Sequence, residues 1–107
     1  MELKEGMYVR TKWGINKINE YVPQSGQLYF KNDVCVKSNV IKASYNIIDL
    51  IEVGDYVNGM QVSRICFDED GGRILNFYGS ILELINEDIK SIITKEMFES
   101  MSYKVSE

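Results

Sequence analysis

Apolar and polar residues alternate over short runs along most of the chain, a pattern typical of half-buried β-strands. The runs are separated by turn residues, including the single proline, Pro23, in the turn at residues 22–26. Such close spacing predicts a small barrel or sandwich. The expected strands are residues 6–12, 15–22, 27–31, 34–37, 40–42 and 47–51 in the first half, and residues 54–57, 60–67, 73–78 and 88–93 in the second.

The C-terminal part of the chain changes character. Residues 80–85 fit either a strand or a short helical turn, and their pattern leaves both open. Thr94 can cap a short helix that carries Glu96 near its positive end and runs with an apolar side toward Met101. Residues 103–105 are then expected to return as a last strand.

The second half of the chain repeats the plan of the first. Gly-Asp-Tyr-Val at residues 54–57 repeats Gly-Met-Tyr-Val at residues 6–9, and residues 88–93 take the place that residues 46–51 hold in the first half. Matching openings and closings indicate a duplicated unit.

The chain is therefore expected to form two β-units, residues 1–53 and residues 54–107, that are packed together. Isolated units of roughly 50 residues bury only about 60% of their surface, so we expect the two to share a core or pack against each other. Residues 46–59 join them directly, without a linker rich in proline or serine. The surface across this join is a reasonable place for a partner.

Composition narrows the class of protein. Hydrophobic residues make up 45% and charged residues 26%, which are globular values. The chain contains no apolar run of about 18 residues and does not begin like a signal peptide, so we expect a cytoplasmic protein without membrane contact. Cys35 and Cys66 are expected to be buried free thiols. Histidine is absent, which removes the commonest general base, and we expect neither an enzyme nor a cofactor.

Charge is unevenly distributed along the chain. Up to Ile51 the chain contains seven Lys or Arg and five Asp or Glu. From Glu52 onward it contains five Lys or Arg and eleven Asp or Glu. An acidic second half disfavours a phosphate backbone and fits a protein partner, although an ordinary solvated surface would have the same composition. The carboxylates chosen as candidate protein-binding residues are Asp49, Glu52, Asp55, Asp68, Glu69 and Asp70.

Residues 68–72, Asp-Glu-Asp-Gly-Gly, form the only dense acidic cluster. Three carboxylates could hold a divalent cation, but the glutamate that would complete a calcium loop is missing. A solvated hairpin turn is the better interpretation, and no metal site is expected.

A second hypothesis is a nucleic-acid-binding module. Basic and aromatic residues on one face of a small barrel can neutralise phosphates and stack bases. The alternative is that the aromatic rings pack in the core while the lysines are ordinary solvated residues. The candidate nucleic-acid-binding residues are Lys12, Trp13, Lys17, Tyr29 and Lys31.

The Gly-x-Tyr-Val openings, each followed by short strands, resemble SH3-like barrels of the KOW type. Residues 46–57 and 89–105 are also similar to small uncharacterised proteins encoded by prophages of Gram-positive bacteria. The resemblance implies two tandem SH3-like barrels and a mobile-element factor that binds and inhibits a bacterial host protein such as a CRISPR nuclease. Exposed edge strands would also allow a homo-oligomer.

Overall fold

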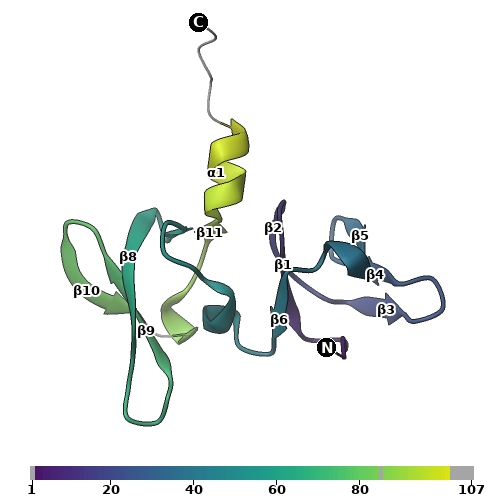
Figure 1. The fold of residues 1–107 in the computed structure, drawn as a ribbon, viewed down its shortest axis with the longest axis horizontal. Coiled ribbons are helices and arrows are strands. Elements are labelled where there is room, and N and C mark those ends of the chain that lie inside the picture. The colour runs from purple at the N-terminus through teal and green to yellow at the C-terminus, as the bar shows by residue number, and fades with distance from the viewer. Residues whose placement is uncertain (1, 85, 102–107) are drawn as a thin grey trace, which may run out of the picture.

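A computed structural model describes residues 2–84 and 86–101 and confirms the mainly β class, with three small sheets and one short C-terminal helix. Figure 1 shows two lobes side by side, with the helix α1 rising between them. The radius of gyration is 15.1 Å, whereas a compact domain of this length would have about 13 Å.

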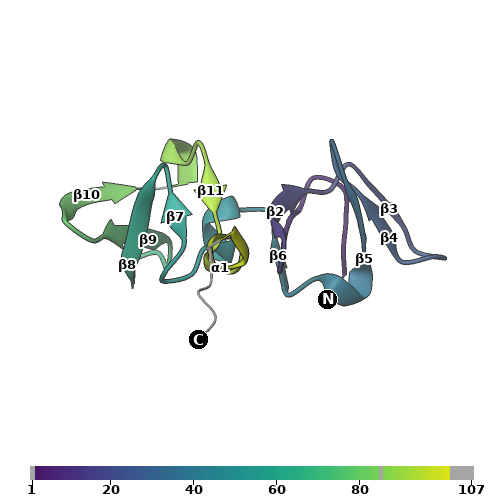
Figure 2. The ribbon, with the colours of Figure 1, turned by 90° about the horizontal axis from the view of Figure 1, so that it is seen from above.

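The first lobe contains two three-stranded antiparallel sheets that face each other (Figure 2). Leu3, Val9, Ile18, Leu28 and Phe30 form the buried core of this lobe. The sheet orders are β2-β1-β6 and β3-β4-β5. The strands are β1 (Tyr8–Thr11), β2 (Gly14–Lys17), β3 (Glu20–Val22), β4 (Gln27–Tyr29), β5 (Val34–Val36) and β6 (Lys42–Ser44), and a 3₁₀ turn, η1 (Lys37–Asn39), precedes β6.

The second lobe is built on one five-stranded antiparallel sheet of order β10-β9-β8-β7-β11. Its core includes Ile51, Val57, Val62, Leu75 and Phe77. Within the described residues, none of the three sheets closes into a barrel. The strands are β7 (Tyr56–Val57), β8 (Met60–Phe67), β9 (Arg73–Phe77), β10 (Ser80–Leu84) and β11 (Ile92–Ile93), and the remaining elements are η2 (Ile47–Leu50), η3 (Asn86–Asp88) and α1 (Lys95–Met101).

The sheet β2-β1-β6 of the first lobe lies between the two hydrophobic cores. One of its faces packs against the core of the first lobe and the other against the core of the second. On one face, Val9 packs in the first core. On the other, Arg10 stands opposite Ile15 in the β1–β2 pair, and Ile15 packs against the second core. Because residues paired in this way share a face, Arg10 also points toward the second lobe. Strand β1 is therefore buried on both sides.

The two lobes repeat a pattern of strand pairing. Strand β1 pairs with β2 and β6, and β7 pairs in the same way with β8 and β11. A helical segment follows the closing strand in each case, η2 after β6 and α1 after β11.

The predicted closing strands are wrong in their positions. Residues 47–51 do not form a strand, because the backbone closes short turns in which Asp49 donates to Asn46 and Ile51 donates to Ile48. The predicted strand at residues 88–93 shrinks to β11 after the 3₁₀ turn η3.

Other boundaries also differ from the prediction. The single strand expected at residues 15–22 is two strands, because the backbone of Ile18 still pairs with Met7 whereas Asn19 already donates to Tyr29 of the opposite sheet. The open choice at residues 80–85 resolves to a strand over the described part. The expected last strand lies outside the described residues. Ala43 is the last residue that packs against the first core, and Ile48 is the first buried residue of the second, while the boundary after Val53 stays a prediction.

Candidate binding surface

Arg10 is fully buried between the lobes and is surrounded by acceptors. Its Nη1 donates to the backbone oxygen of Leu50 at 2.9 Å, and both terminal nitrogens donate to Asp55, which is also fully buried. Its Nη2 donates to Glu96 at 2.7 Å. Glu52 lies 3.0 Å from Nε, although this N–H is not aligned for a hydrogen bond. We call this group the Arg10 cluster.

The charges of the Arg10 cluster support one another. Burial lowers the pKa of Arg10, but the hydrogen bond and charge of Asp55, and then the charges of Glu52 and Glu96, outweigh it and raise the pKa. Asp55 also accepts hydrogen bonds from the backbone amides of Glu52 and Lys95. The two fully buried charges, Arg10 and Asp55, are therefore paired with each other, as a buried ion pair requires.

The Arg10 cluster fixes the helix α1 beside the β1–β2 turn. Glu96 lies in the first turn of α1, and its bond to Arg10 spans 86 positions of sequence. Thr94 Oγ1 accepts from the backbone amide of Met97 at 3.3 Å, which confirms the predicted cap. A side chain at Gly14, whose φ is +131°, would meet the Met97 sulfur at 2.8 Å. The turn and the helix touch at this point.

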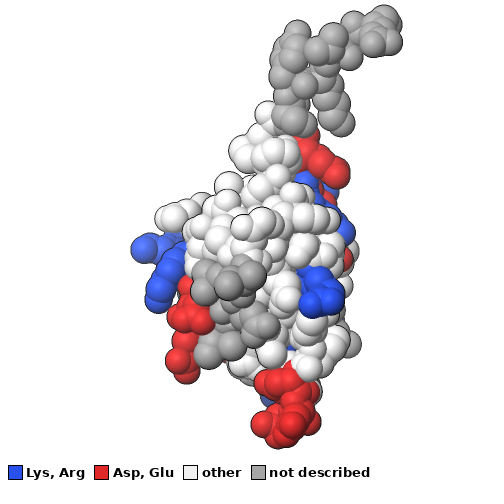
Figure 3. Space-filling view, turned by 90° about the vertical axis from the view of Figure 1, so that its left-hand side faces the viewer, with Lys and Arg blue, Asp and Glu red and all other residues white. Residues whose placement is uncertain are grey.

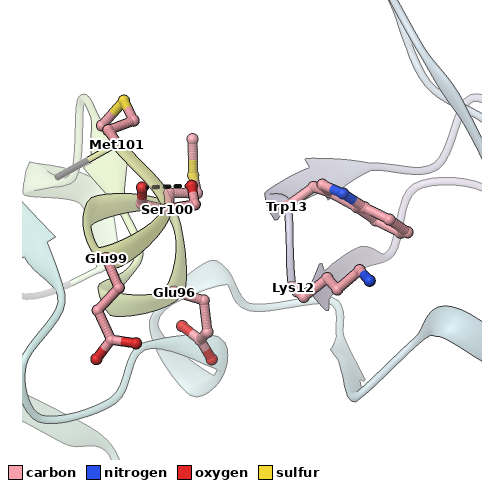
Figure 4. A pocket seen from close by; sticks show the side chains of 7 residues that line it. Lys12, Trp13, Glu96, Glu99, Ser100 and Met101 are labelled. Carbon is pink, nitrogen blue, oxygen red and sulfur yellow. Dashed lines mark hydrogen bonds between the residues drawn. The ribbon is translucent and has the colours of Figure 1, made fainter. Parts of the chain in front are cut away.

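Two hollows border Trp13, which lies in the β1–β2 turn and is 52% exposed. The helix hollow, of about 530 Å³, lies between this turn and α1, and the loop hollow, of about 300 Å³, lies toward the β4–β5 turn. In Figure 4 the Trp13 ring points away from α1, so it lies at the edge of the helix hollow and does not fill it. The helix hollow is lined by Lys12, Trp13, Glu96, Met97, Glu99, Ser100 and Met101, and the loop hollow by Thr11, Trp13, Asn16, Phe30, Asp33, Val34 and Cys35.

The charged groups around the two hollows are mostly acidic. Glu96 and Glu99 line the helix hollow, and Asp33 lines the loop hollow. The one basic side chain in either lining is Lys12, whose Nζ lies 4.7 Å from the centre of the Trp13 ring. An exposed aromatic ring between two hollows whose linings include three carboxylates is a poor binding site for a phosphate backbone. It fits apolar or basic groups better.

The predicted acidic residues separate into different places. Asp55 is buried in the Arg10 cluster, which corrects the expectation that it faces a partner, and Glu52 is half-buried there. Asp49 and Asp68 instead meet at a third hollow, of about 350 Å³, together with Glu87.

The remaining acidic candidates, Glu69 and Asp70, are exposed in the β8–β9 turn, where Asp68 accepts backbone hydrogen bonds from Asp70 and Gly72. Figure 3 shows acidic side chains gathered at the lower tip of the second lobe, where this turn lies in Figure 1. The cluster thus acts as a hairpin turn whose first carboxylate is used internally.

The predicted basic and aromatic residues do not share one surface. Lys12 and Trp13 form the β1–β2 turn, while Lys17 lies at the other end of β2, about 10 Å along the strand, beside Tyr8. Tyr29 is exposed on the separate sheet β3-β4-β5, where its hydroxyl donates to Gln27. Lys31 is exposed in the β4–β5 turn. Only Lys12 and Trp13 line the two hollows.

Further properties of the described residues bear on the class of protein. No group of three or more cysteine or carboxylate side chains among them is placed to hold a metal ion. No helix in the same residues has the length and apolar character needed to cross a membrane. Cys35 and Cys66 are free and half-buried rather than fully buried.

No family model, curated protein or solved structure matches the chain.

Proposed function

We propose that this chain is a non-enzymatic module that binds another protein through the surface formed by Trp13 and the two hollows beside it. One observation carries the proposal: a half-exposed tryptophan stands between hollows whose linings hold three carboxylates and one ammonium group. Tryptophan is enriched among the residues that dominate protein interfaces.

The surface is also pre-organised, which lowers the entropic cost of binding. One wall of the helix hollow comes from the β1–β2 turn and the other from α1. The contact of Met97 with Gly14 and the ion pair of Glu96 with Arg10 hold these walls together. A partner would therefore meet a surface that is already shaped.

The wider context of the proposal is a factor of a phage or another mobile element that acts in the cytoplasm and occludes a bacterial host protein, such as a CRISPR nuclease. The proposal includes two tandem SH3-like units. The repeated pairing of β1 with β2 and β6, and of β7 with β8 and β11, supports a duplicated β-unit.

Affinity capture from a bacterial lysate tests the proposal. Tagged wild-type protein, Trp13→Ala and Tyr78→Ala are compared by mass spectrometry, with and without nuclease treatment. Tyr78 is an exposed aromatic of the second lobe and provides the matched control. Circular dichroism checks that both variants fold.

We expect a protein partner that resists nuclease and is retained by wild type and Tyr78→Ala but lost with Trp13→Ala. Recovery of nucleic acid without a stable protein partner would refute protein binding and favour the nucleic-acid hypothesis. A partner retained equally by all three proteins would refute the assignment of this surface.

A further inference from the structure

We infer that the segment recognised at the Trp13 surface is a peptide of the partner in which an apolar side chain is flanked by lysine or arginine. The inference rests on the proposed function, because it specifies which partner chemistry the same surface selects. The apolar side chain packs beside Trp13 and Met97, and the basic group lies against Glu96. Both contacts are made at the helix hollow.

The polar half of the inference rests on how Glu96 is held. Its side chain is partly exposed and lines the helix hollow, while its Oε2 accepts from Arg10 at 2.7 Å. No hydrogen bond to its Oε1 is found among the described residues. The buried arginine thus fixes one oxygen and leaves the other to accept a charge-assisted hydrogen bond, which is stronger than a neutral one.

Charge around the hollow favours a basic partner over an acidic one. Arg10 is shared among Asp55, Glu52 and Glu96, so it does not neutralise Glu96 alone. Lys12 is the only cation of the lining and already lies over the Trp13 ring. An incoming carboxylate or phosphate would meet Glu96 and Glu99, and like charges at an interface disfavour the wrong partner.

The apolar half rests on the exposed face of α1. Met97, Ser100 and Met101 occupy positions i, i+3 and i+4 and line the helix hollow together. The small side chain of Ser100 between two methionines leaves space for a group from outside. Methionine adapts to varied apolar shapes, which suits a peptide-binding surface.

The first experiment selects the ligand without assuming its sequence. Random twelve-residue peptides displayed on phage are selected on wild-type protein after depletion on Trp13→Ala. We expect enrichment of lysine or arginine within about four residues of an apolar side chain. Enrichment of acidic peptides, or of apolar peptides without basic residues, would overturn the inference.

The second experiment measures the contact with Glu96 by a double-mutant cycle. Trp13 is the only tryptophan, so its fluorescence reports binding of a selected peptide that lacks tryptophan. The peptide and its Lys/Arg→Gln form are each titrated into wild type, Glu96→Gln and the control Glu87→Gln. The cycle isolates the pair only if Glu96→Gln keeps its fold, so circular dichroism and thermal unfolding are compared with those of wild type.

We expect the neutralised peptide to bind wild type and Glu87→Gln about tenfold more weakly, and Glu96→Gln no more than about twofold more weakly. A tenfold loss in all three proteins would overturn the assignment to Glu96. Tighter binding of a twelve-residue oligothymidylate than of the peptide would overturn the peptide class. A Trp13-dependent protein partner without basic preference would leave the proposed function standing and refute this inference alone.

Discussion

Replacing Arg10 with methionine removes the buried cation on which the middle of the molecule depends. The methionine side chain occupies about the same space as the aliphatic part of arginine but donates no hydrogen bond. Asp55 then keeps its two backbone donors and loses both guanidinium nitrogens, and the Leu50 carbonyl oxygen loses its donor. The variant leaves a buried carboxylate without its counter-charge.

The expected loss is about 4 kcal/mol in the free energy of unfolding, because breaking a buried ion pair from one side costs roughly 3–5 kcal/mol. Glu52 and Glu96 add little, since both are partly exposed and regain water. A domain of this size has about 5–15 kcal/mol in total. The variant should therefore remain folded, but with a small remaining free energy of unfolding.

Urea denaturation followed by far-ultraviolet circular dichroism measures the effect. The midpoint should fall by about 2–3 M urea for Arg10→Met. The matched control is Arg64→Met, because Arg64 is exposed and donates a hydrogen bond of 3.3 Å to Asn76. This control should change the free energy of unfolding by no more than about 0.5 kcal/mol. Similar small losses in both variants would refute the reasoning.

A second variant tests the physical cause. If the stranded charge of Asp55 is responsible, Arg10→Met combined with Asp55→Asn should lose less stability than the sum of the two single variants, since the amide is neutral, although one of the backbone amides of Glu52 and Lys95 loses its acceptor. Losses that add fully would show that the cost does not come from the stranded charge.

Three further predictions concern the cap, the turn and a thiol. Thr94→Ala should cost about 1 kcal/mol by removing the α1 cap, whereas Thr94→Ser should keep most of the stability in thermal unfolding. Gly14→Ala should lose more stability than Gly59→Ala in the same assay, because both glycines have positive φ but only Gly14 contacts Met97, and equal losses would contradict that contact. Burial, and then the charge of a nearby carboxylate, raises the pKa of the Cys35 thiol, so its contribution to stability is present below the unfolded pKa and is lost as the pH rises through the folded pKa. Alkylation by iodoacetamide should accordingly have a midpoint at higher pH in the folded protein than in urea, and equal midpoints would contradict the shift.

Elements that depend on neighbouring residues could be predicted from the sequence. The strand over residues 60–67 matches β8 in full, and its hairpin partner follows the Gly71-Gly72 turn as expected. The Thr94 cap was also predictable, because a capping hydroxyl and its amide lie three residues apart. These signals are local, so one sequence contains them.

The Arg10 cluster could not be predicted, because its partners are distant in sequence. Arg10 follows a buried valine in a short strand, and that pattern is normally read as a solvated strand face. Its carboxylates lie 42, 45 and 86 positions later in the chain. Only the packing of the two lobes makes the second face of β1 an interior one.

Trp13 was recognised as a candidate residue, but its surroundings were not. The sequence associates it with lysines, whereas folding brings Glu96 and Glu99 of α1 to the same hollow. The sign of the charge around Trp13 thus depends on tertiary contacts. Trp13 and the nearby lysines favour a nucleic acid on their own, whereas the carboxylates of α1 favour a protein partner.

The double burial of β1 has a consequence for synthesis of the protein. Strand β1 leaves the ribosome well before its last partner, because Glu96 emerges 86 residues after Arg10. Until then Arg10 lacks one of the carboxylates that surround it, and the second face of β1 is incompletely covered even if both cores have formed. The final assembly step is therefore expected to follow translation of α1, so a chain truncated before α1 should be a target for chaperones and proteases.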